Sequence, residues 1–387
     1  MNEPKLRFKA DDGSQFPEWE EKKIGDVAYL NPKTGTIPNE FYYMDLGGVD
    51  RGSWRDKKVV LKEEAPSRAQ RVAMLGDCFF QSVRPLNMGH YLLKNKLDKP
   101  VVASTGFIQM RMKKYICPDF IFQLLFDEKF NKEVELRCTG QTYPAINVDG
   151  FSDIAVHVPC IPEQQKIAEF LSTIDTVIEK QKETVSAWEK RKKGVMQKLF
   201  SQEVRFKTDD GSDFPEWEEK KLGECCDILD SKRKPISKEN RVLGKYAYYG
   251  STNIQDYINE YLFDEPLVLL AEDAGPFDDF WNKAIAQFAT GKFWVNNHAH
   301  VLRPHENRKY FFYSLEHRDI RVYINNPSRG KLNQEDMVKI PMYIPCLAEQ
   351  QKIADCLSSL DEVIEKQKAT LAAWEELKKG LLQQMFV

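Results

Sequence analysis

Two segments of this 387-residue chain each occur twice, and these duplications constrain its fold more than any other feature. Residues 7–25, RFKADDGSQFPEWEEKKIG, are identical to residues 205–223, RFKTDDGSDFPEWEEKKLG, at 16 of 19 positions. Residues 159–200 match residues 345–386 at 26 of 42 positions, around the shared run EQQKIA. The chain therefore consists of two tandem repeats, unlike a solenoid, whose many short repeats resemble one another throughout.

The duplicated segments set the predicted boundaries, because each repeat consists of a leader, a variable region and a long helix. A chain of this length favours two domains, each large enough to bury its own core. The predicted parts are 1–158 (leader and first variable region), 159–200 (first helix), 201–344 (leader and second variable region) and 345–387 (second helix).

The segment from Glu163 to Phe200 is predicted to be one helix roughly 57 Å long, at about 1.5 Å per residue. It contains no proline, and its apolar residues alternate in steps of four and three, as in a coiled-coil seam; the second copy keeps this spacing. The predicted seam residues are Ile167, Leu171, Ile174, Ile178, Gln181 and Trp188 in the first helix, and Ile353, Leu357, Leu360, Ile364, Gln367 and Trp374 in the second.

Chain order predicts that the two helices pair antiparallel. The first helix leads from the first variable region to the second, and the second helix starts where the second region ends. Pairing along their length would create an internal pseudo-twofold repeat with a variable region at each end. Gln181 and Gln367 lie near the middle of their seams, where they either hydrogen-bond and fix the register or face solvent.

The leader is predicted to form a short helical turn. Pro17 suits the first turn of a helix, glutamates follow it, lysines come next, and Gly25 can end it. Such a turn would present Phe16 and Trp19 either to a partner or to a packing contact between domains.

Both variable regions alternate short apolar and aromatic runs with Gly, Pro, Asn and Asp, which is typical of strands. Each also holds one aromatic-rich helical stretch, DFIFQLLFDEKF in the first region and KYFFYSLEHRDI in the second. We therefore predict a mixed α/β (α+β) fold shared by the two regions, with divergent loops. Loops that diverge on a common scaffold usually decide what is bound.

The composition, 42% apolar and 30% charged, is that of a globular chain. No run of 18 apolar residues occurs and the start lacks a signal-peptide core, so we expect a cytoplasmic location with the eight cysteines reduced. The net charge of −3 leaves nucleic-acid binding open, because a basic cleft can lie within a neutral total.

Motifs for catalysis and cofactor binding are absent: the chain contains no GxxxxGK[ST], GxGxxG or HExxH. The run Asp127 to Lys129 is read as a solvated face of a helix rather than a nuclease carboxylate cluster. His298 and His300 would share one face of a strand, and we favour structural hydrogen bonding over a metal site. We predict no catalytic residue and no metal.

The duplicated FPEWEEKK leaders, the duplicated EQQKIA helices and the unlike regions between them resemble the specificity (S) subunit of type I restriction–modification systems (HsdS family). The resemblance covers essentially the whole chain. It implies two target-recognition domains, each reading one half of a bipartite, asymmetric DNA sequence, with the helix pair as a spacer and no catalytic role for this chain.

The resemblance also implies partners. Family members bind two methyltransferase (M) subunits through the helices and adjoining segments, and restriction (R) subunits join the full complex. S-adenosylmethionine is expected on the M subunits, which methylate adenine N6.

For the DNA contacts we select polar residues beside turn residues, since Arg pairs with guanine and Asn or Gln with adenine, and Lys and Arg bind phosphates. The predicted DNA-binding residues are Arg84, Asn87, Gln141, Thr142 and Tyr143 in the first region, and Ser251, Thr252, Asn253, Arg329 and Lys331 in the second.

Two other hypotheses stay open. A cytoplasmic scaffold that binds proteins through two tethered domains fits the near-neutral charge. A nuclease or methylase acting alone is disfavoured by the missing motifs.

Overall fold

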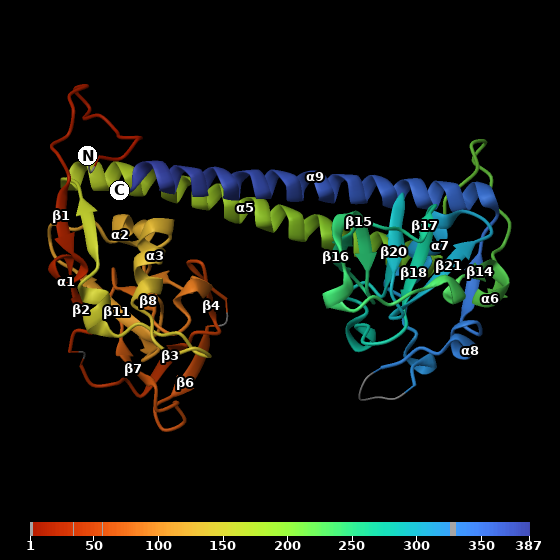
Figure 1. Cartoon of the computed structure of the whole chain (residues 1–387), viewed down its shortest axis with the longest axis horizontal. Coiled ribbons are helices and arrows are strands. Elements are labelled where there is room, and N and C mark those ends of the chain that lie inside the picture. The colour runs from red at the N-terminus through yellow and green to blue at the C-terminus, as the bar shows by residue number, and fades with distance from the viewer. Residues whose placement is uncertain (1–2, 34, 56, 326–329) are drawn as a thin grey trace. The chain divides into compact units, whose positions relative to one another are not determined.

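The computed structural model describes residues 3–33, 35–55, 57–325 and 330–387. It divides into two compact units, residues 1–183 with 368–387 and residues 184–367. The helices α5 (Ile161–Phe200) and α9 (Leu347–Met385) each contribute one part to each unit (Figure 1). Both units combine small β-sheets with helices, which confirms the predicted mixed α/β class.

The first unit is built on two four-stranded sheets. Strands β3 and β10 pair in parallel within one sheet, and the second sheet is antiparallel. The first sheet has the order β6 (Lys58–Leu61), β3 (Glu40–Met44), β10 (Val101–Ser104), β7 (Ala69–Val72), and the second β2 (Ala28–Leu30), β11 (Phe107–Met112), β8 (Cys78–Gln81), β9 (Tyr91–Leu92). The remaining elements besides α5 and α9 are β1 (Glu20–Lys23) paired with β12 (Ala155–Val158), β4 (Val49–Asp50) paired with β5 (Ser53–Trp54), α1 (Ile24–Val27), α2 (Pro118–Leu124), α3 (Glu128–Leu136), α4 (Val148–Ser152) and the 3-10 helix η1 (Pro85–Asn87).

The second unit repeats this topology. One sheet has the order β16 (Ile254–Ile258), β15 (Leu243–Tyr249), β20 (Lys292–Val295), β17 (Phe263–Asp264), and the other β14 (Cys226–Ile228), β21 (Ala299–Pro304), β18 (Leu267–Ala271), β19 (Ala286–Ala289). Besides α5, α9 and several short 3-10 helices, the remaining elements are β13 (Glu218–Lys221) paired with β22 (Pro341–Ile344), α6 (Leu222–Cys225), α7 (Arg308–Glu316) and α8 (Gln334–Met337). Here β15 and β20 form the parallel pair. The matching strand order confirms that the two variable regions share a fold.

The two duplicated segments contact each other, which explains why they are duplicated together. Glu163, in the first turn of α5, is fully buried and accepts hydrogen bonds from the Arg7 guanidinium at 2.8 and 3.0 Å and from the Trp19 indole at 3.2 Å. Glu349, in the first turn of α9, is bonded in the same way by the second leader. The leader therefore fixes the start of each long helix.

The leader does not form the predicted helical turn between Pro17 and Gly25. Glu20–Lys23 form β1, which pairs antiparallel with β12 so that Glu20 lies opposite Val158. This pairing partner is remote in sequence and outweighs the local helix signals. Trp19 is buried and packs against Phe120 of its own unit, so it serves packing within the unit rather than the predicted packing contact between domains.

The predicted helix over 163–200 is confirmed, since α5 runs from Ile161 to Phe200. In the first unit, Asp175 of α5 forms an ion pair with Lys378 of α9, and Lys182 lies 3.9 Å from Glu375. Because the α5 number rises as the α9 number falls, these segments run antiparallel. Asp175 also accepts a hydrogen bond from Gln123 of α2 at 2.7 Å, which ties the variable region to both helices.

The second unit contains the corresponding arrangement. Lys192 of α5 forms an ion pair with Asp361 of α9 at 2.8 Å, and the Tyr313 hydroxyl of α7 donates to Asp361 at 2.6 Å. Lys192 also bonds both carboxylate oxygens of Glu316 at 2.8 and 3.0 Å. Each variable region is thus fixed to the helices by an Asp–Lys pair at equivalent positions of the repeat.

The predicted seam residues differ in how deeply they are buried, and four of them, Ile167, Leu171, Ile353 and Leu357, belong to the cores of the two units. Seven of them are buried: Ile167, Leu171, Ile174, Ile178, Ile353, Leu357 and Ile364. Five are half-buried: Gln181, Trp188, Leu360, Gln367 and Trp374.

The stretch DFIFQLLFDEKF forms two helices instead of the one predicted. Asp127 lies between α2 and α3 and caps α3, because its Oδ2 accepts the backbone N–H groups of Lys129 and Phe130 at 2.9 and 3.1 Å. Asp127 is buried, so the prediction that it belongs to a solvated helix face is wrong for this residue. Burial raises the pKa of its carboxyl above the usual range.

Candidate nucleic-acid interface

Two loops of the first unit bring the predicted residues Arg84 and Tyr143 together. The N–H of Arg84 donates to the carbonyl of Pro144 at 2.7 Å, and Val83 pairs with Ala145. The Arg84 guanidinium lies 4.2 Å from the centre of the Tyr143 ring, a cation–π contact. All five residues predicted for this region are exposed, namely Arg84, Asn87, Gln141, Thr142 and Tyr143.

Buried side chains stabilise the conformation of the loop after β8. Arg84 has a positive φ of 50°, which is uncommon for a residue with a side chain and costs about 1 kcal/mol or more. The buried amide of Gln81 accepts from the N–H of Gly89 at 2.8 Å and donates to the carbonyl of Val83 at 2.7 Å. Burial lowers the pKa of His90 to about 3, so its ring is neutral and Nδ1 accepts the N–H of Gln81.

The second unit forms the same pair of loops with other residues. Lys331 pairs with both Asp273 and Asn325, just as Ala145 pairs with Val83 and Thr139 in the first unit. The Ser251 hydroxyl donates to the carbonyl of Asp273 at 2.6 Å, so the predicted residues Ser251 and Lys331 lie at one place.

The other residues predicted for this region are placed less closely. Thr252 and Asn253 continue the turn after β15, where the carbonyl of Asn253 accepts the N–H of Gly250 at 2.8 Å. Arg329 lies outside the described residues.

Sequence reasoning missed Asp273 as a member of this surface. Its carboxylate bonds Nδ1 of His298 at 2.8 and 3.0 Å, and both side chains are partly exposed. The two residues are 25 positions apart and follow or precede different strands, so no local motif marks them. The prediction that His298 and His300 serve in hydrogen bonds is confirmed. The prediction that they share one face of a strand is wrong, because β21 begins at Ala299 and His298 lies in the turn before it.

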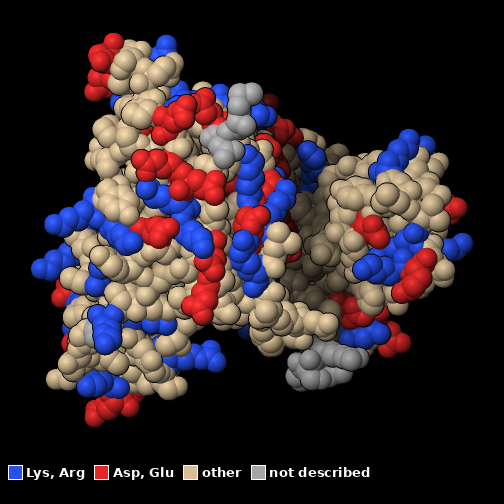
Figure 2. Space-filling model, turned by 60° about the vertical axis from the view of Figure 1, so that its left-hand side comes forward, with Lys and Arg blue, Asp and Glu red and all other residues tan. Residues whose placement is uncertain are grey.

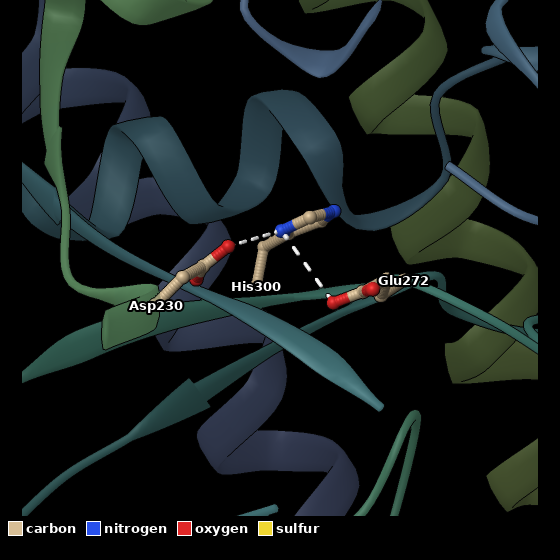
Figure 3. Close-up of side chains that lie close together, drawn as sticks. All are labelled: Asp230, Glu272 and His300. Carbon is tan, nitrogen blue, oxygen red and sulfur yellow. Dashed lines mark hydrogen bonds and ion pairs between the residues drawn. The ribbon is translucent and has the colours of Figure 1, made fainter. Parts of the chain in front are cut away.

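Asp230, Glu272 and His300 form a largely buried charged cluster (Figure 3). Nδ1 of His300 lies 2.6 Å from Asp230 and 3.9 Å from Glu272, and Nε2 lies 2.9 Å from the carbonyl of Leu332. Both ring nitrogens thus lie within hydrogen-bond distance of an oxygen atom, and the tautomer of the ring decides which nitrogen donates.

The distances of Asp230, Glu272 and His300 would allow a metal ion. The guanidinium of Arg233, however, bonds Glu272 at 2.5 Å and lies 3.3 Å from Asp230. This internal cation supplies the positive charge that a metal would bring, so we interpret the group as a salt-bridge cluster. Glu272 extends it to the surface, 3.6 Å from the Lys331 ammonium.

On the face drawn in Figure 2, Lys and Arg side chains are interspersed with Asp and Glu rather than gathered in one patch. Charge alone therefore does not identify the partner, in agreement with the net charge of −3. Within the described residues, no helix combines the length and the apolar composition needed to cross a membrane.

The chain matches a protein-family model described as type I restriction modification DNA specificity domain, over residues 17–186 and 215–373. A relative from Methanocaldococcus jannaschii, the type I restriction enzyme MjaVIII specificity subunit, is 24% identical over 97% of this chain and 94% of its own length. A putative type I restriction enzyme specificity subunit of Haemophilus influenzae is 37% identical, over 38% of this chain and 37% of that protein.

Solved structures show the same fold. The S subunit of a type I restriction–modification system from M. genitalium aligns with a TM-score of 0.59 and 17% identity, over 100% of this chain and 99% of that one. A chain from a study of complex assembly and conformational transition of the type I R-M system aligns with a TM-score of 0.54 and 20% identity, over 95% and 97% of the two chains.

Proposed function

Because this chain belongs to the type I restriction–modification DNA specificity family, we propose that it is the sequence-reading subunit of such a complex, with each unit reading one half of a bipartite, asymmetric target. The observation that carries this proposal is the pair of loops found in both units. They follow β8 or β18 and precede α4 or α8, on sheets of the same strand order. The side chains on them differ between the units, as two readers of different half-sites require.

The first unit offers Arg84 and Tyr143 for recognition. An arginine can donate two hydrogen bonds to O6 and N7 of guanine in the major groove. The cation–π contact with Tyr143 restricts the guanidinium before DNA arrives, which lowers the entropy lost on binding. In the second unit, Lys331 can contact a phosphate or a guanine from the corresponding place.

The long helices have a second role in this proposal. They pair as an antiparallel coiled coil with an internal pseudo-twofold axis, set the gap between the half-sites, and dock two M subunits. S-adenosylmethionine binds the M subunits, R subunits join the full complex, and this chain performs no catalysis. Support comes from the Asp–Lys pairs that join α5 to α9 in each unit.

The test uses the complex of this chain with M subunits. Complexes in which this chain carries one substitution are compared with the wild-type complex. We choose Arg84→Asn, since Asn tolerates a positive φ, together with Lys331→Ala. As a control, Lys99→Ala removes a lysine that bonds Glu40 on the other four-stranded sheet. The readouts are the methylated motif in a host genome and fluorescence anisotropy with duplexes that carry it.

We expect Arg84→Asn to relax one half-site about 10- to 100-fold and leave the other intact, because a good base contact is worth about 1–3 kcal/mol. Lys331→Ala should weaken binding through the other half-site, with a shallower salt dependence if it contacts a phosphate. Lys99→Ala should change neither. A wild-type complex that binds every duplex equally at all salt concentrations would contradict the proposal and favour the scaffold hypothesis.

A further inference from the structure

The pair formed by Asp273 and His298 lies where two neighbouring strands of the second unit meet the surface. Asp273 follows β18, and His298 precedes β21, which is paired with β18. The backbone joins them as well, because the N–H of Glu272 donates to the carbonyl of His298 at 3.0 Å. The side chains of His298 and Asp273 are 44% and 34% exposed, so the pair is open to a ligand.

Asp273 orients the imidazole of His298. The carboxylate lies 2.8 and 3.0 Å from Nδ1, and a carboxylate can only accept, so Nδ1 carries the hydrogen. In the neutral ring, Nε2 is then an acceptor directed away from this bond. A fixed acceptor of this kind suits the exocyclic amino group of adenine or cytosine, which both bases present in the major groove.

Polar groups of three loops converge on this pair. Ser251 donates its hydroxyl to the carbonyl of Asp273, and Lys331 pairs with the backbone of Asp273 while half of its side chain stays exposed. The buried charged cluster of Asp230, Glu272 and His300 supports the same loops, since Glu272 also accepts the N–H of Leu332 with its backbone carbonyl. The pair is therefore at the centre of the loops assigned to recognition.

The fold itself does not require the pair. In the first unit the bond equivalent to Glu272–His298 runs from the N–H of Ser82 to the carbonyl of Gly106, so Val83 and Gly106 occupy the positions of Asp273 and His298. Neither residue has an ionisable side chain. An exposed charge pair also adds at most about 1 kcal/mol to stability.

We propose that His298, oriented by Asp273, reads one base pair of the half-site bound by the second unit, by accepting a hydrogen bond from an adenine or cytosine amino group. This inference rests on the proposed function. His298 is the specificity-determining residue, and Asp273 is a positioning residue that acts through it.

The test uses His298→Ala and Asp273→Ala in the full complex with M subunits. A matched control is His305→Ala: His305 bonds Asp227 through Nε2 at 3.1 Å and is 49% exposed, but it lies at the opposite end of β21. The readouts are the methylated motif and the Kd for the cognate duplex and for duplexes with one base pair changed. Thermal unfolding of each variant checks that it is folded.

We expect His298→Ala to lose about tenfold discrimination at one base pair of one half-site, and Asp273→Ala to lose less at the same base pair. His305→Ala should keep the motif. An unchanged motif and unchanged single-base discrimination in a folded His298→Ala complex would overturn the inference and leave the proposed function intact. If the wild-type complex bound all duplexes with the same Kd, the proposed function itself would be wrong.

Discussion

At the scale of single residues, a comparison of equivalent positions in the two units shows which charged side chains the fold does not need. Asp230 in the second unit and Asn31 in the first each accept a hydrogen bond from the neighbouring strand β21 or β11. His300, however, lies where the first unit has the buried Ile108, as the strand registers show. Because the same fold tolerates an apolar core here, we attribute the charged cluster to the loops that it supports rather than to stability.

Asp127 allows a prediction on pH. Its Oδ1 is buried with no hydrogen-bond partner among the described residues, and burial raises the pKa of this carboxyl above its ordinary value of 3.8. A raised pKa in the folded state means that ionisation of Asp127 destabilises the fold. The resulting loss in the free energy of unfolding is absent below pH about 4 and develops as the pH rises through the folded-state pKa. Asp127→Asn keeps the helix cap and removes this charge.

We therefore expect Asp127→Asn to raise the free energy of unfolding relative to the wild type at pH 7 and to have almost no effect at pH 3.5. Urea unfolding at both values measures this. Asp149→Asn, at an exposed position in the first turn of α4, serves as the control. An Asp127→Asn effect of the same size at both pH values would show that the charge is not its cause.

At the scale of elements, the sequence predicts what depends on local pattern. The long helices follow from period and the absence of proline, and strands were found in both variable regions. The prediction of a helical turn in the leader was wrong because β1 forms by pairing with β12, and no local signal in the leader reveals this partner. Likewise, turn residues pointed to Arg84 and Tyr143, but the pairing of Asp273 with His298 depends on the register of β18 and β21.

The attachment of α7 to the helices gives a second prediction. Lys192 is about 10% exposed and forms ion pairs with both Glu316 and Asp361. Lys192→Met keeps much of the apolar stem but leaves two carboxylates near each other without a cation, which should cost about 3–5 kcal/mol. Hydrogen exchange should speed up in α7 and less so in α2. Lys198→Met, which breaks an exposed pair with Glu203, should cost less than about 1 kcal/mol.

Equal exchange rates in α7 for Lys192→Met and Lys198→Met would show that the buried ion pairs do not hold the variable region in place. The equivalent change in the first unit is Lys378→Met, which removes the partner of Asp175. It should affect α2 instead of α7, because Gln123 of α2 bonds Asp175.

At the scale of the whole molecule, neither repeat is a self-contained unit. The end of α9 and the residue after it supply Leu382, Met385 and Phe386 to the core of the first unit, although these residues belong to the second repeat. The second unit in turn takes Met196 and Leu199 from the end of α5. Each recognition domain is thus completed by a helix of the other repeat, and the helices cannot be shortened at their ends without opening a core.

Length can instead be changed in the middle of the helices, and this gives the last prediction. Inserting four residues after Gln181 and four after Gln367 adds about one turn, or roughly 6 Å, to each helix. An insertion of four is a stutter, which changes the winding of a coiled coil only locally. Since a base pair rises about 3.4 Å, the accepted gap between the half-sites should grow by one or two base pairs, while the half-site bases stay the same. The methylated motif of the host genome reports both quantities. An insertion in α5 alone should instead misalign the two helices and lower the melting temperature. If the double insertion is stable and the accepted gap between the half-sites is unchanged, the helices do not set the spacing.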